Sequence, residues 1–382
     1  MMRPMKLGGE QILFGEGSLA HLETLNFEKA VVVIGSDTFI KNGLLDKVET
    51  HLEKASIAME TFVGVEPNPG FETVKKGAAF MQEHQPDLIV ALGGGSVMDA
   101  AKAMWIYYEN PGLDSLKPLM DKKTFPKLRK KAKFLCIPTT AGTGSEVSRS
   151  IVITDDKTGI KYGIGNMEMM PDIAICDPVA TLTLPKGLTA ETGMDTIAHA
   201  LEALASTRAN YLSDIMAEKA FVDAYETLPK VLENPKNIRR RETMLNASMV
   251  AGMAFTNVSL GIVHSIAHSL GSLFNLSHGL SNAVLLPYVL RFNSRDEKTA
   301  ALYDRLAGEV GHPSLPEALT RLNEQAGIPK ALKDLVPDEQ AFMDKLDRLI
   351  ELSVNDGCTK TNPITPTYEE FKTLIMHAYH GQ

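Results

Sequence analysis

Short apolar runs alternate with amphipathic stretches through the first half of the chain, and this alternation restricts the possible folds more than any other feature. Residues 39–55, 71–83 and 97–108 carry apolar side chains at helical spacing. Five runs rich in β-branched residues predict strands, and these are residues 30–35, 57–62, 87–92, 134–138 and 173–176. Such a βαβ succession predicts an α/β fold with a largely parallel sheet, in which ligands bind outside the carboxyl ends of the strands.

The strand signal ends at Pro185, and the rest of the sequence predicts helices joined by short polar loops. A chain of 382 residues has room for two domains. We therefore expect an α/β domain at residues 1–184 and an all-helical domain at residues 185–382.

The charge balance and the cysteines exclude several classes of protein. The chain has 39 Lys and Arg against 47 Asp and Glu, a net charge of −8, which argues against binding nucleic acid through bulk charge. Its three cysteines are too widely separated for a disulfide framework or a Cys-x-x-Cys pair, and the N-terminus lacks the layout of a signal peptide. We expect a cytoplasmic protein.

Residues 243–290 contain no Asp, Glu, Lys or Arg, and this stretch is long enough to cross a bilayer. Asparagines, histidines, serines and glycines interrupt it, however, and these polar groups would be costly opposite lipid. We therefore interpret the stretch as buried helices of a globular core and expect no membrane partner.

Two glycine-rich segments each follow a predicted strand. Residues 91–102 read ALGGGSVMDAAK, and three glycines before a helix let backbone N–H groups approach a pyrophosphate closely. Residues 137–146 read IPTTAGTGSE, a loop with four hydroxyl side chains that could wrap phosphate and ribose. Either segment alone could be a tight turn, but two such loops on one sheet edge favour a dinucleotide site.

Asp37 follows the first predicted strand, where a carboxylate can accept hydrogen bonds from the adenosine ribose and repel a 2′-phosphate. This position favours NAD(H) over NADP(H). Asp37 could equally be a cap for the helix that begins near residue 38.

The histidines form a pattern that suits a metal. Asp195 and His199 are four residues apart on a predicted helix and share a face, as do His264 and His268. His278 lies at a helix break predicted around residues 277–279. One carboxylate and three imidazoles would satisfy a divalent cation and leave one of the four histidines outside the ligand set. Ligands without sulfur suit Fe(II), Zn(II), Mn(II) or Co(II), and intrinsic affinity favours zinc over iron.

Four segments together resemble the iron-containing, group III alcohol dehydrogenases: GGGSVMDAAK, IPTTAGTGSE, GMDTIAHALEA and HSIAHSLGSLFNLSHG. The resemblance covers nearly the whole chain in the family's order, and it includes Asn68 between two prolines and the late Asn362-Pro363. The later segments are similar to the alcohol dehydrogenase half of bifunctional aldehyde-alcohol dehydrogenases. The family has a Rossmann-like N-terminal domain and an all-helical C-terminal domain, an architecture shared with dehydroquinate synthase.

The resemblance implies a role for particular residues. Asp195, His199, His264 and His278 would bind the metal in the domain 185–382, and His268 would lie beside the substrate. The dinucleotide would be contacted in the domain 1–184 by Asp37, Asn68, Gly94, Gly95, Ser96, Asp99, Thr139, Thr140, Thr143, Ser145, Lys161 and Leu182. One departure is Ile364, where many relatives carry Arg. The family also implies a homo-oligomer, at least a dimer.

The expected reaction is hydride transfer between NAD(H) and a small aldehyde or primary alcohol, with Fe²⁺ expected by resemblance and Zn²⁺ as the alternative. Lactaldehyde, 3-hydroxypropanal, butanal and sulfoacetaldehyde are candidate substrates. The carbonyl oxygen gains negative charge, which a divalent cation stabilises, and His268 is the candidate proton donor because imidazole commonly transfers protons at neutral pH.

Several alternatives deserve a test. A lyase of the dehydroquinate synthase type needs basic residues near the metal, which residues 243–290 do not supply. A non-catalytic dinucleotide sensor would have a structural metal, but structural sites are usually sulfur-rich. Residues 368–372 match the Tyr-x-x-x-Lys spacing of short-chain reductases, and the basic run 127–133 could meet an anionic partner, although solvated surfaces explain both more simply.

Overall fold

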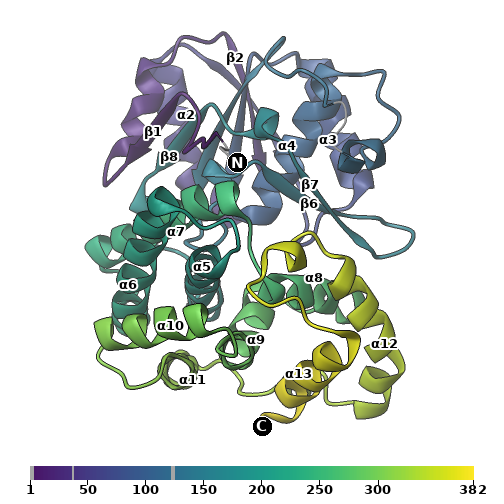
Figure 1. Ribbon diagram of the computed structural model, residues 1–382. Coiled ribbons are helices and arrows are strands. Elements are labelled where there is room, and N and C mark those ends of the chain that lie inside the picture. The colour runs from purple at the N-terminus through teal and green to yellow at the C-terminus, as the bar shows by residue number, and fades with distance from the viewer. Residues whose placement is uncertain (1–3, 37, 122–124) are drawn as a thin grey trace. The chain divides into compact units, whose positions relative to one another are not determined.

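The computed structural model describes residues 4–36, 38–121 and 125–382. The chain divides into two compact units, Met1–Leu184 and Pro185–Gln382 (Figure 1). The first unit holds every strand found among the described residues, and the second is helical.

The first unit is built on a parallel sheet of six strands in the order β1-β8-β5-β4-β2-β3. The strands are β1 (Gln11–Phe14), β2 (Lys29–Ile34), β3 (Ala58–Val63), β4 (Leu88–Gly93), β5 (Lys133–Pro138) and β8 (Ile173–Cys176). The predicted α/β fold with a mostly parallel sheet is confirmed, and all five predicted strands are present within one residue of their predicted ends. The edge strand β1 was not predicted.

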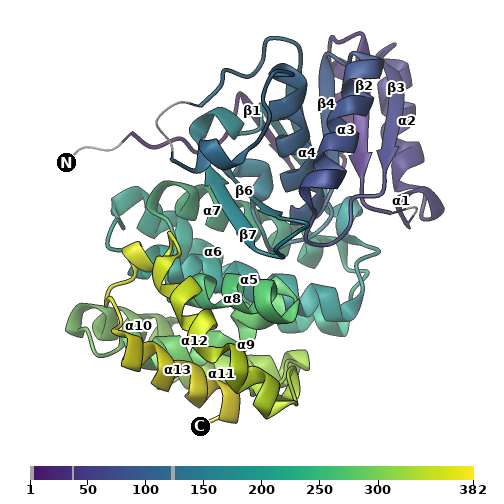
Figure 2. The same cartoon turned by 90° about the vertical axis from the view of Figure 1, so that its right-hand side faces the viewer.

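Helices cover both faces of this sheet, as Figure 2 shows for the strands β2, β3 and β4. Val31 and Val33 of β2 belong to a core with α3 (Phe71–His84) and α4 (Gly95–Glu109). The alternate residues of β2, such as Val32, pack with α2 (Leu44–Lys54). Because successive side chains of a strand point to opposite faces, the continuous apolar sequence of β2 requires a helix on each side.

Two local features differ from the sequence interpretation. The predicted helix at residues 39–55 is two helices, α1 (Thr38–Lys41) and α2, because Gly43 between them takes the left-handed conformation with φ 74°. The strands β6 (Ser150–Thr154) and β7 (Lys161–Gly165) form an antiparallel hairpin that was missed. Glycines in β7 weaken its strand signal, and the polar residues between the strands look like an ordinary loop.

The second unit contains only helices among its described residues, as predicted for the region after Pro185. They are α5 (Lys186–Ala205), α6 (Tyr211–Glu233), α7 (Ile238–Val258), α8 (Ile262–Phe274), α9 (His278–Asn293), α10 (Glu297–Glu309), α11 (Leu315–Ala326), α12 (Glu339–Asn355) and α13 (Tyr368–His380). Helix α5 packs against α6, α7 and α9, and α8 packs against α9 and α12.

The charge-free residues 243–290 form most of α7 together with α8 and most of α9, and their apolar side chains are largely buried, as predicted. No single helix within the described residues is long and apolar enough to cross a membrane. Helices α7 and α8 pass that test only when they are taken together, and they are bent by 99° at the break between them.

A buried lysine ties the loop after β5 to α4. Lys102 is fully buried, and its Nζ donates hydrogen bonds to the backbone oxygens of Ser145 at 2.7 Å and Ser148 at 2.9 Å. The nearby Asp99 carboxylate accepts hydrogen bonds from Ser145 Oγ and from the backbone N–H of Val152, both at 2.9 Å. An ammonium group so deeply buried is tolerated only because these acceptors and the carboxylate surround it.

Replacement of Lys102 by methionine should therefore destabilise the first unit by about 3 kcal/mol, because buried acceptors lose their donor and Asp99 loses its counter-charge. Chemical unfolding followed by the fluorescence of Trp105, the only tryptophan of the chain, reports on this unit. The matched control is Lys75→Met, at an exposed position of α3. Equal unfolding midpoints for the two variants would contradict this account.

Candidate metal and dinucleotide sites

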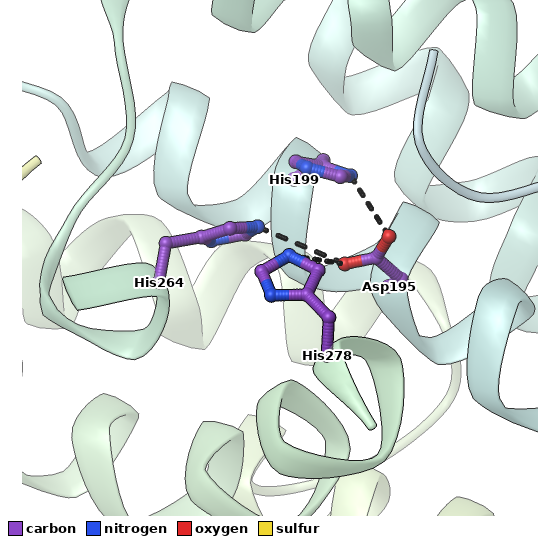
Figure 3. Close-up of side chains that lie close together, drawn as sticks. All are labelled: Asp195, His199, His264 and His278. Atoms are coloured by element: carbon purple, nitrogen blue, oxygen red, sulfur yellow. Dashed lines mark ion pairs between the residues drawn. The ribbon is translucent and has the colours of Figure 1, made fainter. Parts of the chain in front are cut away.

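Four side chains that lie far apart in the sequence meet within the second unit (Figure 3). Asp195 and His199 are one turn apart on α5, so they project from the same face of that helix. His264 lies in the first turn of α8, and His278 is the first residue of α9. The helix break predicted around residues 277–279 lies slightly earlier, at residues 275–277 between α8 and α9.

The ligand atoms of these four residues all lie within 4.8 Å of one another. Asp195 Oδ1 is 3.7 Å from Nε2 of both His264 and His278, and Asp195 Oδ2 is 3.8 Å from Nδ1 of His199. The Asp195 and His264 side chains are almost completely buried, whereas His278 is 32% exposed. The cluster is therefore closed on most sides and open beside His278.

The electrostatics of the cluster suit a cation. Burial alone would raise the pKa of the Asp195 carboxyl, but the imidazoles of His199, His264 and His278 hold it well below its usual range. Burial lowers the pKa of His264, but the carboxylates of Asp195 and Glu202 beside its ring outweigh burial and raise the pKa to about 9. The Asp195 carboxylate is thus ionised, whereas burial lowers the pKa of His278 well below its usual range and keeps that imidazole neutral.

Asn282 provides a test of whether these residues fit a metal. Its Nδ2 lies 2.7 Å from Asp195 Oδ1, 3.2 Å from His264 Nε2 and 3.1 Å from His278 Nε2. Its Oδ1 is buried and has no hydrogen-bond partner in the described part of the chain. One amide group cannot satisfy all three of these atoms as acceptors, whereas a divalent cation takes carboxylate oxygen and imidazole nitrogen together. The residues present fit a four-ligand divalent site.

His268 lies next to this cluster but outside its ligand set. Its ring stacks on that of His278 with centroids 5.3 Å apart, and its side chain is 24% exposed. His268 Nδ1 is 2.9 Å from Asp356 Oδ2. Asp356 follows α12 and also accepts a hydrogen bond from the backbone N–H of Cys358 at 2.7 Å. His268 is therefore oriented by a carboxylate and has access to solvent.

Three residues around the site were not identified from the sequence: Glu202, Asn282 and Asp356. Glu202 follows His199 by three residues on α5, and Asn282 follows His278 by four on α9, so helical spacing was a usable signal for both. Asp356 is 88 residues from His268, and no local pattern connects them.

The predicted dinucleotide residues lie in the first unit, most of them near the carboxyl ends of neighbouring strands. Gly93 at the end of β4 pairs with Pro138 at the end of β5, so the two glycine-rich segments leave the sheet side by side. The predicted shared edge is confirmed. A Cβ atom on Gly95 would lie 2.7 Å from Thr143 Cγ2, and one on Gly94 would lie 3.1 Å from Thr140 Cγ2. The glycines therefore let the two loops touch.

Further contacts join other members of the predicted set. Lys161 Nζ at the start of β7 donates to Asn68 Oδ1 at 2.8 Å, and Asn68 N lies 3.4 Å from Ser96 Oγ. Asp99 accepts from Ser145 Oγ, and Thr139 N donates to the oxygen of Gly93 at 3.0 Å. Burial lowers the pKa of Lys161 to about 8. Contacts between these residues and a dinucleotide remain predictions.

The remaining predicted positions are less connected. Leu182 follows the short 3-10 helix Pro178–Thr181 after β8. Asp37 lies outside the described residues.

Tyr368 is exposed at the start of α13, where its hydroxyl group bonds Asp347 Oδ1, as expected for a solvated helix face. In the basic run, Arg129 pairs with Asp172 of its own unit.

Comparison with known families gives two consecutive matches. The model described as iron-containing alcohol dehydrogenase matches residues 9–178, and the model of the C-terminal part of the Fe-containing alcohol dehydrogenase family matches residues 189–379. The two matches span nearly the whole chain.

Individual proteins agree with the family models. The chain is 42% identical over 377 residues to the NADPH-dependent butanol dehydrogenase of Clostridium saccharobutylicum, covering 97% of this chain and 96% of that protein. It is 37% identical over 410 residues to the bifunctional aldehyde-alcohol dehydrogenase of Escherichia coli strain K12, covering 98% of this chain and 46% of that protein.

The same relationship holds for solved structures. The iron-containing alcohol dehydrogenase of Thermococcus thioreducens gives a TM-score of 0.92 at 34% identity, covering 99% of this chain and 100% of that one. The resemblance inferred from the motifs is confirmed, and the non-catalytic alternative is set aside. The chain belongs to the iron-containing alcohol dehydrogenase family and is an enzyme of that type.

Proposed function

We propose that this enzyme reversibly reduces a short, uncharged aldehyde to its primary alcohol with NADH as hydride donor. The observation that carries the proposal is the convergence of Asp195, His199, His264 and His278, whose ligand atoms lie within 4.8 Å of one another. We propose these four residues as the metal ligands. A bound divalent cation supplies Lewis-acid polarisation of the carbonyl oxygen, and the reduced nicotinamide supplies hydride.

The chain's own residues prepare the metal site for this role. Asp195 contributes a negative charge held in place by Asn282, and the imidazoles add neutral donors. Iron is proposed ahead of zinc because the family is named for iron, although the ligand types suit both.

His268 is proposed as the residue that delivers the proton to the product oxygen. Asp356 lies at hydrogen-bond distance from Nδ1, so Nε2 remains available for proton exchange with substrate or water. Its partial exposure gives the ring a route to solvent protons.

The substrate is proposed to be small and weakly charged. Residues 243–290, which supply His264, His268 and His278, contain no cationic group that could bind an anionic tail. Ile364 is apolar and lies two residues after Asn362. The side-chain Oδ1 of Asn362 lies 3.3 Å from the backbone nitrogen of Ile262 at the start of α8, the helix that carries His264 and His268. Butanal, lactaldehyde and 3-hydroxypropanal suit this description better than sulfoacetaldehyde does. The Clostridium relative is named for butanol, which supports this order.

NADH is proposed ahead of NADPH because, in the sequence, the carboxylate of Asp37 follows the predicted strand at residues 30–35. The residues proposed to contact the dinucleotide are Asp37, Asn68, Gly94, Gly95, Ser96, Asp99, Thr139, Thr140, Thr143, Ser145, Lys161 and Leu182. A cytoplasmic location and a homo-oligomer of at least two chains stay predictions from the sequence and its family.

Metal removal tests the proposed reaction itself. The metal-loaded protein should oxidise NADH with at least one aldehyde of a short panel. Chelation should abolish this activity, and Fe²⁺ or Zn²⁺ should restore it, because carbonyl polarisation depends on the ion. The Asp195→Asn variant should bind less than one metal ion per chain. If the metal-loaded enzyme turned over no short aldehyde, the proposal would be wrong.

The His268→Ala variant should lose about 10²–10⁴-fold in kcat, the usual contribution of a general acid, while its metal content stays unchanged. The measurement is steady-state kinetics with metal analysis of the same sample. His377→Ala, an exposed histidine of α13, is the matched control and should behave as wild type. Loss of metal from His268→Ala would show that this histidine is a ligand instead.

The cofactor preference depends on Asp37 and can be measured directly. A hydrogen bond to a charged group contributes about 1.5–3 kcal/mol, so kcat/KM should favour NADH over NADPH by roughly 10–100-fold. Asp37→Gly should reduce that ratio toward unity by weakening NADH use and relieving repulsion of the 2′-phosphate. A wild-type preference for NADPH, as in the name of the Clostridium relative, would overturn the role given to Asp37.

A further inference from the structure

Glu202 is a buried carboxylate that the proposed reaction does not use directly. It lies on α5 seven residues after Asp195 and three after His199, so all three project from one face of the helix. Its side chain is 4% exposed. A buried carboxylate is costly unless its oxygens are hydrogen-bonded, so its partners indicate its purpose.

Each oxygen of Glu202 has a different partner in the first turn of α8. Oε2 lies 2.6 Å from His264 Nδ1, and Oε1 accepts a hydrogen bond from the backbone N–H of Val263 at 2.7 Å. Among the described residues, no Lys or Arg forms an ion pair with this carboxylate, and His264 is its one ion-pair partner. The carboxylate is therefore directed at the proposed metal ligand.

This contact fixes which nitrogen of His264 can bind a cation. An acceptor on the Nδ1 side keeps the proton on Nδ1, which leaves the lone pair of the neutral ring on Nε2. His264 Nε2 is the atom that faces the cluster, 3.7 Å from Asp195 Oδ1 and 3.2 Å from Asn282 Nδ2.

We propose that Glu202 is a positioning residue of the metal centre, which holds His264 in the orientation and tautomer that presents Nε2 to the ion. The inference rests on the metal site proposed above. Carboxylates that accept the second N–H of a metal-bound imidazole have this effect in metalloproteins, where they raise the basicity of the ligand.

The charge balance of the buried cluster gives Glu202 a second effect. Asp195 alone leaves one positive charge of a divalent cation unbalanced, because the three imidazoles bind as neutral ligands. Glu202 supplies the second negative charge from the far side of the His264 ring. Helices α8 and α9 carry no acidic side chain that could do so. Burying the ion together with two carboxylates costs less than burying a net charge.

Glu202 also caps α8, and the structure separates this effect from the contact with His264. Gly261, the N-cap of α8, provides no side-chain hydrogen bond, so Oε1 satisfies the free N–H of Val263 instead. A Cβ atom on residue 261 would lie 2.7 Å from Glu202 Oε1, which explains the glycine there. Oε1 holds the helix, and Oε2 orients the imidazole.

The isosteric variant Glu202→Gln tests the proposal because glutamine has one oxygen for these two donors. If that oxygen faces Val263, the amide NH₂ faces Nδ1 and moves the imidazole proton to Nε2, where it blocks the metal. We expect Zn²⁺ or Co²⁺, measured in competition with a chelator, to bind about 10–100-fold more weakly. The absorption spectrum of the Co²⁺ form should change as well.

Glu109→Gln is the matched control for the loss of a buried carboxylate. Glu109 of α4 is also 4% exposed and accepts hydrogen bonds from the backbone N–H groups of Lys130, Lys131 and Ala132, all in the first unit. This variant should unfold at lower denaturant concentration while its metal affinity stays within twofold of wild type. If Glu202 had a purely structural role, Glu202→Gln would behave like Glu109→Gln: it would unfold at lower denaturant concentration and keep its metal affinity.

A measurement on the wild type covers the case in which Glu202→Gln does not fold. In zinc-loaded protein labelled with ¹⁵N-histidine, His264 should carry its proton on Nδ1 and bind zinc through Nε2. Zinc on Nδ1, or unchanged metal affinity in a folded Glu202→Gln variant, overturns the role of Glu202 alone. Failure of the wild type to bind one ion, or binding unaffected by His199→Ala and His278→Ala, overturns the proposed metal site instead.

Discussion

The helical unit depends on one electrostatic constraint, the burial of the Asp195 carboxylate in a core that is otherwise poor in charge. A carboxylate in such surroundings must have partners, and three imidazoles from α5, α8 and α9 converge on it. The charge-free residues 243–290 supply His264 and His278 and place no Lys or Arg of their own beside this carboxylate. Glu202 and Asn282 contact the side chains that we propose as metal ligands, at His264 Nδ1 and Asp195 Oδ1.

The α/β unit also buries a charged group that must have hydrogen-bonding partners, but here the group is a cation. Lys102 is a buried cation whose hydrogen bonds hold the loop after β5 against α4, next to the glycines that follow β4. The loop that we propose to bind a dinucleotide is thereby held in place without a ligand. Preorganised donors of this kind bind phosphate without a large cost in loop entropy.

Local sequence patterns predicted much of this molecule. Periodicity identified five of the six parallel strands and the helical second half, and the spacing of Asp195 and His199 predicted a shared face that the structure contains. Patterns failed where the information is not local. The link between His268 and Asp356 spans 88 residues, and the break at Gly43 depends on one backbone angle. Glu202 was readable from its helical spacing, but an acidic residue on a helix usually faces solvent, so only its burial reveals its purpose.

An anomalous difference map from crystals loaded with Fe²⁺ or Zn²⁺ tests the central claim most directly. We predict one strong peak per chain, with an Asp195 oxygen and one nitrogen each of His199, His264 and His278 at about 2.0–2.2 Å. A peak bound by other residues, or no peak in a protein that still reduces aldehydes, would contradict it.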